Sequence, residues 1–203
     1  WCDLIPERAE AFKEKAGCGE AYTDYKTMLD EVKPDMVFVC VPPYCHGEIE
    51  FALIERGIHF FVEKPLALDL DLARKIRDEV EKAGLITAVG FQCRYSNIVK
   101  DTQEFCKRHT INFVNCLRMG GIPGAPWWKA KSLSGGQIVE QTVHNFDMIR
   151  YIMGEPTQVY TMGLTLFIFS SLIIRARITA SGKVAKDHRL MVMVLPSNVQ
   201  KLG

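Results

Sequence analysis

Short, continuous apolar runs recur along the first half of the chain. Met36–Val41, Ile58–Val62 and Leu85–Val89 are rich in β-branched and aromatic residues and contain no Asp, Glu, Lys or Arg. For Met36–Val41 this is the pattern of a strand that is buried on both faces, as in a parallel sheet. Prolines follow the first two runs closely, and proline ends a strand because it cannot donate to a sheet ladder.

Amphipathic stretches separate these runs. Helices are predicted over residues 7–16, 24–32, 46–56 and 69–83. In the last of these, Asp69 can cap the first turn, Gly84 follows the end, and one face carries Leu72, Ile76 and Val80. Strands that alternate with helices of about a dozen residues indicate βαβ units and a right-handed parallel sheet, which is an α/β fold.

The pattern changes after Gln92. A strand is predicted at Ile111–Met119, an irregular segment follows, and Gln137–Met153 is predicted as a strong helix. Residues 167–180 and 189–195 have the composition of strands. The chain therefore predicts a parallel-sheet domain over residues 1–96 and an α+β domain over residues 97–203.

The composition narrows the range of partners. Lys and Arg number 25 against 24 Asp and Glu, so no basic field is expected that would attract nucleic acid or an anionic membrane. The longest apolar stretch, Leu164–Ile174, is too short to cross a bilayer. The seven cysteines include no C-x-x-C pair, which favours a reducing cytoplasm and leaves no zinc-ligand spacing.

Polar groups follow each apolar run at its carboxyl end. They are Pro42, His46, Glu63, Lys64, Gln92 and Arg94. Because open parallel sheets bind ligands outside this edge, we expect the set to share one crevice, although each residue alone fits a strand end that meets solvent. Lys64 is the best candidate for proton transfer. Glu63 would tune its charge, and the alternative for this neighbouring pair is an ordinary solvated ion pair.

A second group of polar residues falls on one stripe of the predicted helix Gln137–Met153. At about 100° per residue, the stripe contains Glu140, His144, Asp147 and Tyr151. A carboxylate and a histidine one turn apart can act as a general acid and base. The same spacing could hold a metal, although further ligands are missing, or it could be an i,i+4 surface pair.

Together these motifs resemble the Gfo/Idh/MocA family of NAD(P)-dependent oxidoreductases, which includes inositol dehydrogenase and glucose-fructose oxidoreductase. The resemblance covers residues 1 to about 163. Its motifs are CD-x-x-x-x-R at 2–8, VPPYCH at 41–46, EKP at 63–65, GFQCR at 90–94 and GG-x-x-x-E-x-x-x-H-x-x-D at 135–147. It implies a Rossmann domain followed by an α+β domain with a large, mainly antiparallel sheet.

The resemblance also implies roles for individual residues. Asp3 would bind the adenosine ribose, which favours NAD over NADP because a carboxylate repels a 2′-phosphate. The other residues implied along the cofactor are Arg8, Val41, Pro42, His46, Glu63, Lys64 and Gln92. Lys64 would contact the reacting oxygen, His144 would transfer its proton, and Glu140 would support His144. The implied substrate contacts are Arg94, Trp128 and Asp147, and no metal is implied.

Two of these substrate residues could instead serve the fold. Arg94 could pair with Glu63. Trp127 and Trp128 could stack on a sugar ring, but tryptophans of this kind are more often packing or interface residues.

The implied activity is hydride transfer between NAD and one carbon of a sugar, polyol or related cyclic hydroxy compound. That carbon is a carbinol in one state and a carbonyl in the other. We expect a cytoplasmic homodimer or homotetramer. Two alternatives are an NAD-binding regulator without turnover and a glycosidase of the same family that uses NAD transiently.

Three features depart from the family pattern. The first strand and its G-x-G-x-x-G turn do not occur in the sequence, so we expect a segment that carries them to precede Trp1. Residue 140 is Glu where the family usually has Asp. The sequence after Gly163 does not follow the usual continuation, so no site residue is placed there, and His188 is expected on the surface.

Overall fold

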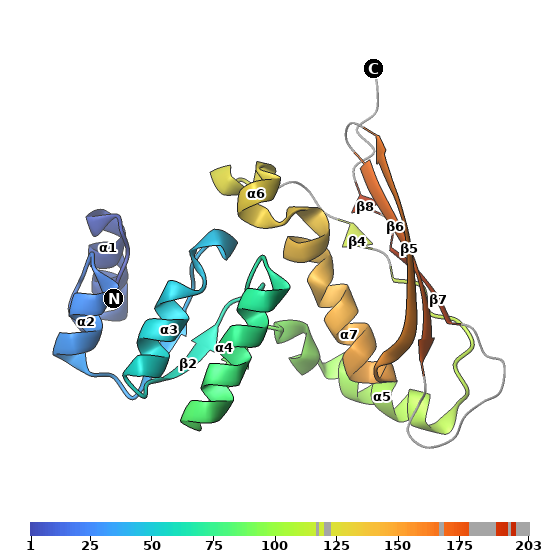
Figure 1. The fold of residues 1–203 in the computed structure, drawn as a ribbon, viewed down its shortest axis with the longest axis horizontal. Coiled ribbons are helices and arrows are strands. Elements are labelled where there is room, and N and C mark those ends of the chain that lie inside the picture. Colours follow the sequence, from blue (N-terminus) through green and yellow to red (C-terminus); the bar gives the residue numbers. More distant parts are fainter. Residues whose placement is uncertain (117, 120–122, 167–168, 179–189, 195, 198–203) are drawn as a thin grey trace. The chain divides into compact units, whose positions relative to one another are not determined.

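The computed structural model describes residues 1–203 except 117, 120–122, 167–168, 179–189, 195 and 198–203. It divides into two compact units, Trp1–Gly90 and Phe91–Gly203 (Figure 1), and each is described by itself. His188 lies outside the described residues. In the part of the chain that is described, no helix is long and apolar enough to cross a membrane.

The first unit is built on a parallel sheet. Its strands are β1 (Met36–Val39), β2 (His59–Val62) and β3 (Thr87–Val89), hydrogen-bonded in the order β1-β2-β3. Val39 lies opposite Val62, which in turn lies opposite Val89. The predicted parallel sheet is thus confirmed. Strand β1 ends at Val39, two residues earlier than predicted.

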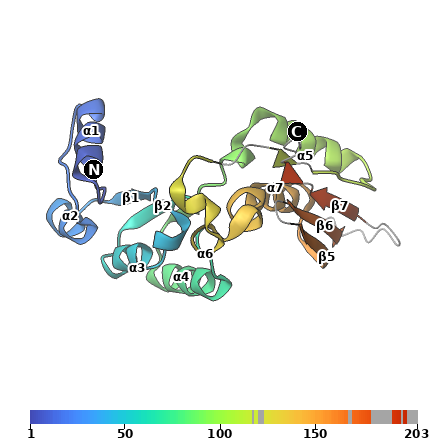
Figure 2. The ribbon, with the colours of Figure 1, turned by 90° about the horizontal axis from the view of Figure 1, so that it is seen from above.

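The first unit also contains four α-helices, all of which were predicted, and the last two of them connect the three strands. They are α1 (Pro6–Ala16), α2 (Tyr25–Val32), α3 (Glu48–Glu55) and α4 (Leu70–Ala83). The Asp69 carboxylate accepts the Leu72 N–H at 2.9 Å, which caps α4, and Gly84 ends it in the left-handed conformation. Figures 1 and 2 both show α3 and α4 side by side along the sheet.

The core of this unit lies between the sheet and these two helices. Phe60 and Val62 of β2 pack with Leu53 of α3 and Ile76 of α4, and all four are at most 2% exposed. Each buried side chain of this size contributes about 1.5–3 kcal/mol to folding.

The opposite face of β1 differs from the prediction. Met36 is 51% exposed and Phe38 is 63% exposed, so the expectation that this strand is buried on both faces was wrong. The reason is that α3 and α4 cover the face that carries Val37 and Val39, whereas Phe38 lies against the ring of Phe61 on the other face.

The second unit contains a pair of helices that contact each other. This unit contains α5 (Asn97–Arg108), α6 (Lys131–Ser134) and α7 (Val143–Met153), and α5 contacts α7 through a Gln103 Nε2 bond to Tyr151 O at 3.1 Å. The predicted helix Gln137–Met153 is helical, but near its start it contains a π-helical turn, η4 (Ile138–Thr142).

Strands follow α7, and the composition predicted those over 169–178 and 190–194 but not the one over 156–166. They are β5 (Pro156–Leu166), β6 (Phe169–Ile178) and β7 (Leu190–Val194), which form an antiparallel sheet in that order. The predicted strand Ile111–Met119 was wrong over 111–116, because that segment joins no ladder in the described part of the chain. Only β4 (Arg118–Met119) is a strand there, and it pairs with β8 (Pro196–Ser197).

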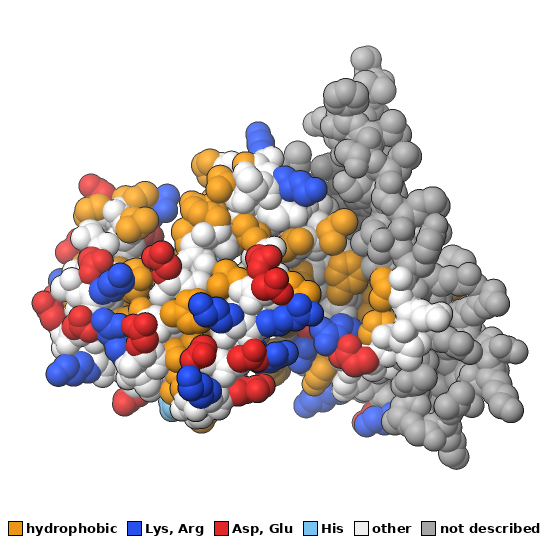
Figure 3. All heavy atoms as spheres, viewed as in Figure 1, with side chains coloured by type: hydrophobic (Ala, Val, Ile, Leu, Met, Phe, Trp, Pro, Cys, Tyr) orange, Lys and Arg blue, Asp and Glu red, His pale blue; other side chains and the backbone are white. Residues whose placement is uncertain are grey.

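Charges are mixed on the face of the molecule shown in Figure 3. Acidic and basic side chains are interspersed over the described residues, and on this face they form no extended region of one sign. The view agrees with the near-equal totals of acidic and basic residues in the sequence.

Candidate active site

The end of β2 positions Glu63 and Lys64. The Glu63 N–H donates to Val39 O at 2.9 Å, so the ladder with β1 continues one residue beyond the strand. Lys64 follows, half-buried, and the Lys64–Pro65 peptide bond is cis. Both side chains therefore start from the carboxyl edge of the sheet, where open parallel sheets bind ligands.

Gly90 leaves room for the Glu63 carboxylate. The Gly90 N–H donates to Val62 O at 2.8 Å, and this bond holds the Gly90 Cα close to Glu63, the residue after Val62. A Cβ atom on Gly90 would lie 2.9 Å from Glu63 Oε2 and 3.1 Å from Glu63 Cδ, closer than such atoms normally approach. Glu63 Oε2 also accepts the Lys64 N–H at 3.2 Å. The missing side chain at position 90 thus determines where this carboxylate lies.

His46 is held inside the first unit by a buried glutamate. The turn η1 (Pro43–Cys45) leads to it, and both His46 and Glu50 have fully buried side chains. His46 Nδ1 lies 2.7 Å from Glu50 Oε1, and Glu50 Oε2 accepts the Gly47 N–H at 2.5 Å. This arrangement secures the first turn of α3. A contact between His46 and a cofactor stays a prediction.

The other cofactor residues predicted in this unit also lie near strand ends. Val41 and Pro42 are half-buried beyond β1. Asp3 follows Cys2, which forms a parallel bridge with Tyr22, and Asp3 Oδ1 accepts the Ile5 N–H at 2.8 Å. The Asp3 carboxylate therefore lies at the carboxyl end of this parallel bridge, a position suited to binding ribose hydroxyls. Arg8 is exposed in the first turn of α1.

Arg94 and Asp147 form a two-pronged ion pair in the second unit. Arg94 lies in η2 (Gln92–Tyr95), and its Nε donates to Asp147 Oδ2 at 2.7 Å while Nη2 donates to Oδ1. The hydrogen bonds to Asp147 raise the pKa of Arg94. The guanidinium also lies over the Tyr151 ring, 4.7 Å from its centroid. The two residues predicted to contact substrate thus bind each other, and Gln92 of the same turn is exposed.

His144 is buried in α7 together with Glu140 of the preceding π turn. They are 5% and 6% exposed, so the alternative of an i,i+4 surface pair was wrong. The Phe91 ring meets the imidazole edge-on at a centroid distance of 6.1 Å, and Cys93 Sγ lies 3.9 Å from His144 Nδ1. Contacts on two sides orient the imidazole, as a proton-transfer residue requires.

Glu140 also contacts a tryptophan from the irregular segment that precedes it. Trp128 lies in η3 (Pro126–Lys129), and its Nε1 donates to Glu140 Oε2 at 2.9 Å. In the sequence between Trp128 and Glu140, Ser134 Oγ donates to Ala130 O and accepts the Gly136 N–H, each at 3.0 Å. These two hydrogen bonds stabilise the backbone of residues 130–136. π-Helical turns such as the one that holds Glu140 are frequent at functional sites.

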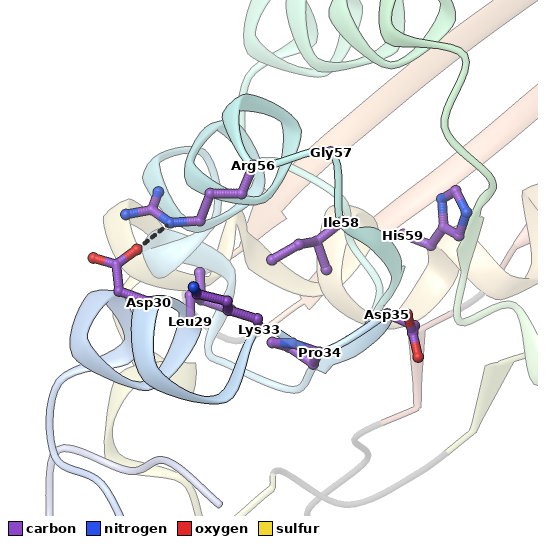
Figure 4. Close-up of a pocket in the computed structure, with 9 residues that line it drawn as sticks. All are labelled: Leu29, Asp30, Lys33, Pro34, Asp35, Arg56, Gly57, Ile58 and His59. Atoms are coloured by element: carbon purple, nitrogen blue, oxygen red, sulfur yellow. Dashed lines mark hydrogen bonds and ion pairs between the residues drawn. The ribbon is translucent and has the colours of Figure 1, made fainter.

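A hollow of about 610 Å³ opens at the other edge of the first unit's sheet (Figure 4). It forms where Pro34 and Asp35 lead into β1 and Ile58 leads into β2, and the Arg56–Asp30 ion pair of 2.8 Å lies at one side. No predicted site residue lines it. Because it lies at the amino ends of the strands, we place the candidate active site at the carboxyl edge instead.

The described residues contain no group of three or more His, Cys, Asp or Glu side chains that could hold a metal ion.

Some residues that shape the candidate site were missed by sequence reasoning. Glu50 follows His46 by four residues, so the i,i+4 rule for helices could have paired them. Gly90 stands directly after a predicted strand, where a glycine can signal close approach of another group. The contact of Phe91 with His144 joins residues far apart in the chain and has no local signal.

Two family profiles match this chain. Residues 2–91 match the profile described as "Oxidoreductase family, NAD-binding Rossmann fold", and residues 110–170 match the "GFO/IDH/MocA C-terminal domain". The chain belongs to the Gfo/Idh/MocA family. The resemblance seen in the motifs is therefore confirmed, and the parallel sheet of the first unit is the Rossmann fold of this family.

Named Gfo/Idh/MocA relatives and solved structures agree with this assignment. The myo-inositol 2-dehydrogenase of Thermotoga maritima is 32% identical over 183 residues, which are 90% of this chain and 53% of that protein. The D-glucoside 3-dehydrogenase of Escherichia coli is 32% identical over 164 residues, covering 76% and 46%. The crystal structure of a probable dehydrogenase from Thermotoga maritima has a TM-score of 0.79 at 26% identity, covering 96% and 60%. The chain spans about half the length of these curated relatives.

Proposed function

We propose that this protein transfers a hydride between NAD and a carbinol or carbonyl carbon of a sugar, polyol or related cyclic hydroxy compound. The observation that carries the proposal is the position of Lys64 directly beyond the carboxyl end of β2, within the segment that matches the NAD-binding profile. The names of the relatives, a myo-inositol and a D-glucoside dehydrogenase, support the substrate class.

The residues of the first unit fit a dinucleotide. The Asp3 carboxylate can accept two ribose hydroxyls and would repel a 2′-phosphate, which favours NAD over NADP. Val41 and Pro42 would line the path beyond β1. The space left by Gly90 lets the Glu63 carboxylate lie at the edge, where it can accept the N–H groups of a carboxamide. Bound NAD would supply the hydride acceptor for the carbinol carbon.

Lys64 and His144 would have separate roles at the reacting oxygen and its proton. The Lys64 ammonium would donate a hydrogen bond to the reacting oxygen and stabilise the negative charge that develops there. His144, whose Nδ1 faces Cys93 Sγ, would take the hydroxyl proton on Nε2 and return it in the reverse direction. That both side chains reach one substrate is part of the proposal.

The test uses the complete protein with NAD and a panel of inositols, D-glucosides and aldoses, and it follows the appearance of NADH by absorbance. Lys64→Met and His144→Asn should each lower kcat by about a hundredfold or more, because each removes a group that acts on the reacting oxygen or its proton. Lys100→Met, at an exposed position of α5, is the matched control and should behave as the parent.

Two results would redirect the proposal. If the parent binds NADH but reduces NAD with no compound of the panel, the protein is an NAD-binding regulator instead. If it releases free sugar from a glycoside without net reduction of NAD, it is a glycosidase.

We also propose a homodimer or homotetramer in the cytoplasm. In the complete protein, β5, β6 and β7 would belong to a larger, mainly antiparallel sheet that forms the subunit interface. The seven cysteines, all free, suit a reducing compartment. Light scattering coupled to size-exclusion chromatography tests the assembly, and a monomer at micromolar concentration would contradict it.

A further inference from the structure

The 3-10 turn η2 is bound to α7 close to His144. Arg94 of this turn forms the two-pronged ion pair with Asp147, which is buried and lies three residues after His144 in the helix. Cys93, the preceding residue of the turn, has its Sγ 3.9 Å from His144 Nδ1, and the Phe91 ring lies edge-on to the imidazole. The ion pair therefore holds the short segment that brings Cys93 and Phe91 to the imidazole.

The Phe91 contact alone does not distinguish the two ways in which the imidazole can lie in its plane. The χ2 torsion of a histidine is roughly two-fold, and half a turn about it exchanges Nδ1 with the carbon Cδ2. The Phe91 ring meets a plane of the same shape in either case. Cys93 Sγ differs, because it can share a hydrogen bond with a ring nitrogen. Its position 3.9 Å from Nδ1 thus favours one orientation of His144, and Nε2 then faces a different side of the ring.

The same contact bears on the proton of the neutral imidazole. A neutral imidazole carries one ring proton, and the nitrogen that lacks it is the acceptor. The hydrogen bond made by one ring nitrogen determines which of the two is protonated. For Nε2 of His144 to take a hydroxyl proton, the ring proton must lie on Nδ1, and the partner of Nδ1 must accept it. A thiol sulfur accepts an N–H weakly, in keeping with the separation of 3.9 Å.

We propose that Cys93 is a positioning residue for proton transfer, whose sulfur accepts the Nδ1–H of His144 and so keeps Nε2 as the basic nitrogen. The inference rests on the proposed function and deepens it, because it assigns the tautomer in which His144 works. The hydroxyl proton goes to Nε2 and the hydride goes to NAD, while Cys93 neither gains nor loses a proton. The imidazolium that forms keeps its Nδ1–H bond to the sulfur, so the same contact serves the reverse reaction.

The test compares two substitutions of Cys93 in the complete protein, with saturating NAD and the compound of the panel that the parent oxidises. Cys93→Ala removes the acceptor. Cys93→Asn supplies another, because an amide oxygen lies two bonds beyond Cβ, reaches farther than the sulfur and is a stronger acceptor. The matched control is Cys106→Ala in α5. Cys106 is also a half-buried cysteine of the second unit, and its thiol donates to Met153 Sδ at 3.6 Å.

The kinetic effect should appear in kcat and not in KM. Cys93→Ala should lower kcat by about two- to fivefold, the effect of one weak hydrogen bond, while KM changes by less than about twofold. Cys93→Asn should recover most of that loss, and Cys106→Ala should keep the kcat of the parent. Urea unfolding of each variant checks that it is folded.

The tautomer itself can be measured without turnover. The ¹⁵N resonances of an imidazole distinguish a protonated ring nitrogen from one with a lone pair, and the signals that disappear in His144→Asn are those of His144. In the parent, at a pH where this imidazole is neutral, Nδ1 should carry the proton and Nε2 the lone pair. Cys93→Ala should raise the population of the Nε2–H tautomer, whereas Cys93→Asn and Cys106→Ala should keep the signals of the parent.

Two results would overturn the inference. One is a parent whose neutral His144 carries its proton on Nε2. The other is a Cys93→Ala variant with the imidazole signals of the parent, because any fall in its kcat then comes from packing and not from the tautomer. If the parent turns over no compound of the panel, the proposed function fails, but the imidazole signals still decide whether Cys93 determines the tautomer.

Discussion

Alanine at position 90 would put a methyl group where the Glu63 carboxylate now lies. The added Cβ would be 2.9 Å from Glu63 Oε2, whereas ordinary contacts begin at 3.4 Å, so the carboxylate must move by about half an ångström or rotate away. The backbone itself can remain, because Gly90 does not occupy the left-handed region that only glycine adopts readily. The substitution therefore tests the position of one side chain and not the fold.

The expected changes in the free energy of unfolding and in kcat/KM separate an effect on the Glu63 side chain from an effect on the fold. Gly→Ala at a compatible backbone position stabilises by about 0.4–1 kcal/mol through the unfolded state, which offsets part of the local crowding. The free energy of unfolding should thus change by less than about 1 kcal/mol. A misplacement of about 1 Å at an active site can cost about a hundredfold in rate, so half that distance predicts a fall of about tenfold in kcat/KM.

The assay combines urea unfolding, NADH affinity by fluorescence and steady-state kinetics. Gly124→Ala is the matched control, because a Cβ there meets open space, and it should match the parent in all three. Glu63→Ala and the double variant Glu63→Ala/Gly90→Ala should be equally impaired. Parent-like affinity and kcat/KM in Gly90→Ala would refute the reasoning, as would a loss of more than about 2 kcal/mol of stability.

Three further changes probe the two units. Arg94→Met leaves the buried Asp147 carboxylate without its partner and should lower the free energy of unfolding by roughly 2 kcal/mol in urea titrations, less than for a fully buried pair because the Arg94 side chain is 37% exposed. Leu53→Ala, at a fully buried position, should cost about 2–5 kcal/mol in the same titrations. The Thr27 backbone N–H lowers the pKa of Asp24, so this carboxylate stabilises α2 above its unfolded pKa of about 3.9, and the contribution is lost as the pH falls through the lower folded value. Unfolding titrations between neutral and acidic pH should show a smaller loss of stability in Asp24→Asn than in the parent.

Local chemistry accounts for the features that the sequence predicted well. Asp69 and Gly84 bracket α4 because a carboxylate caps the first turn and a glycine ends the last, and neither effect needs distant residues. The apolar run at β2 likewise predicted a buried strand that ends beside Lys64. These signals were sufficient for the parallel sheet and for the edge where Lys64 lies.

The missed features depend on partners far away in the chain. Met36 and Phe38 have the composition of a buried strand, but burial of a face depends on which helices cover it. Residues 111–116 have strand composition but join no ladder in the described part of the chain. The bond from Trp128 to Glu140 spans an irregular segment, and the apolar periodicity that predicted the helix does not distinguish a π turn at Glu140 from an α-helical one.

The π-helical turn at Ile138–Thr142 has an evolutionary consequence. Such a turn holds one residue more than an α-helical turn, so a helix can accommodate a one-codon insertion there. Loss of one codon within this turn would let a continuous α-helix form, while the residues on either side of the turn keep nearly the same faces. A single in-frame deletion, with no side chain replaced, would thus move Glu140 within its turn and weaken its bond to the indole of Trp128.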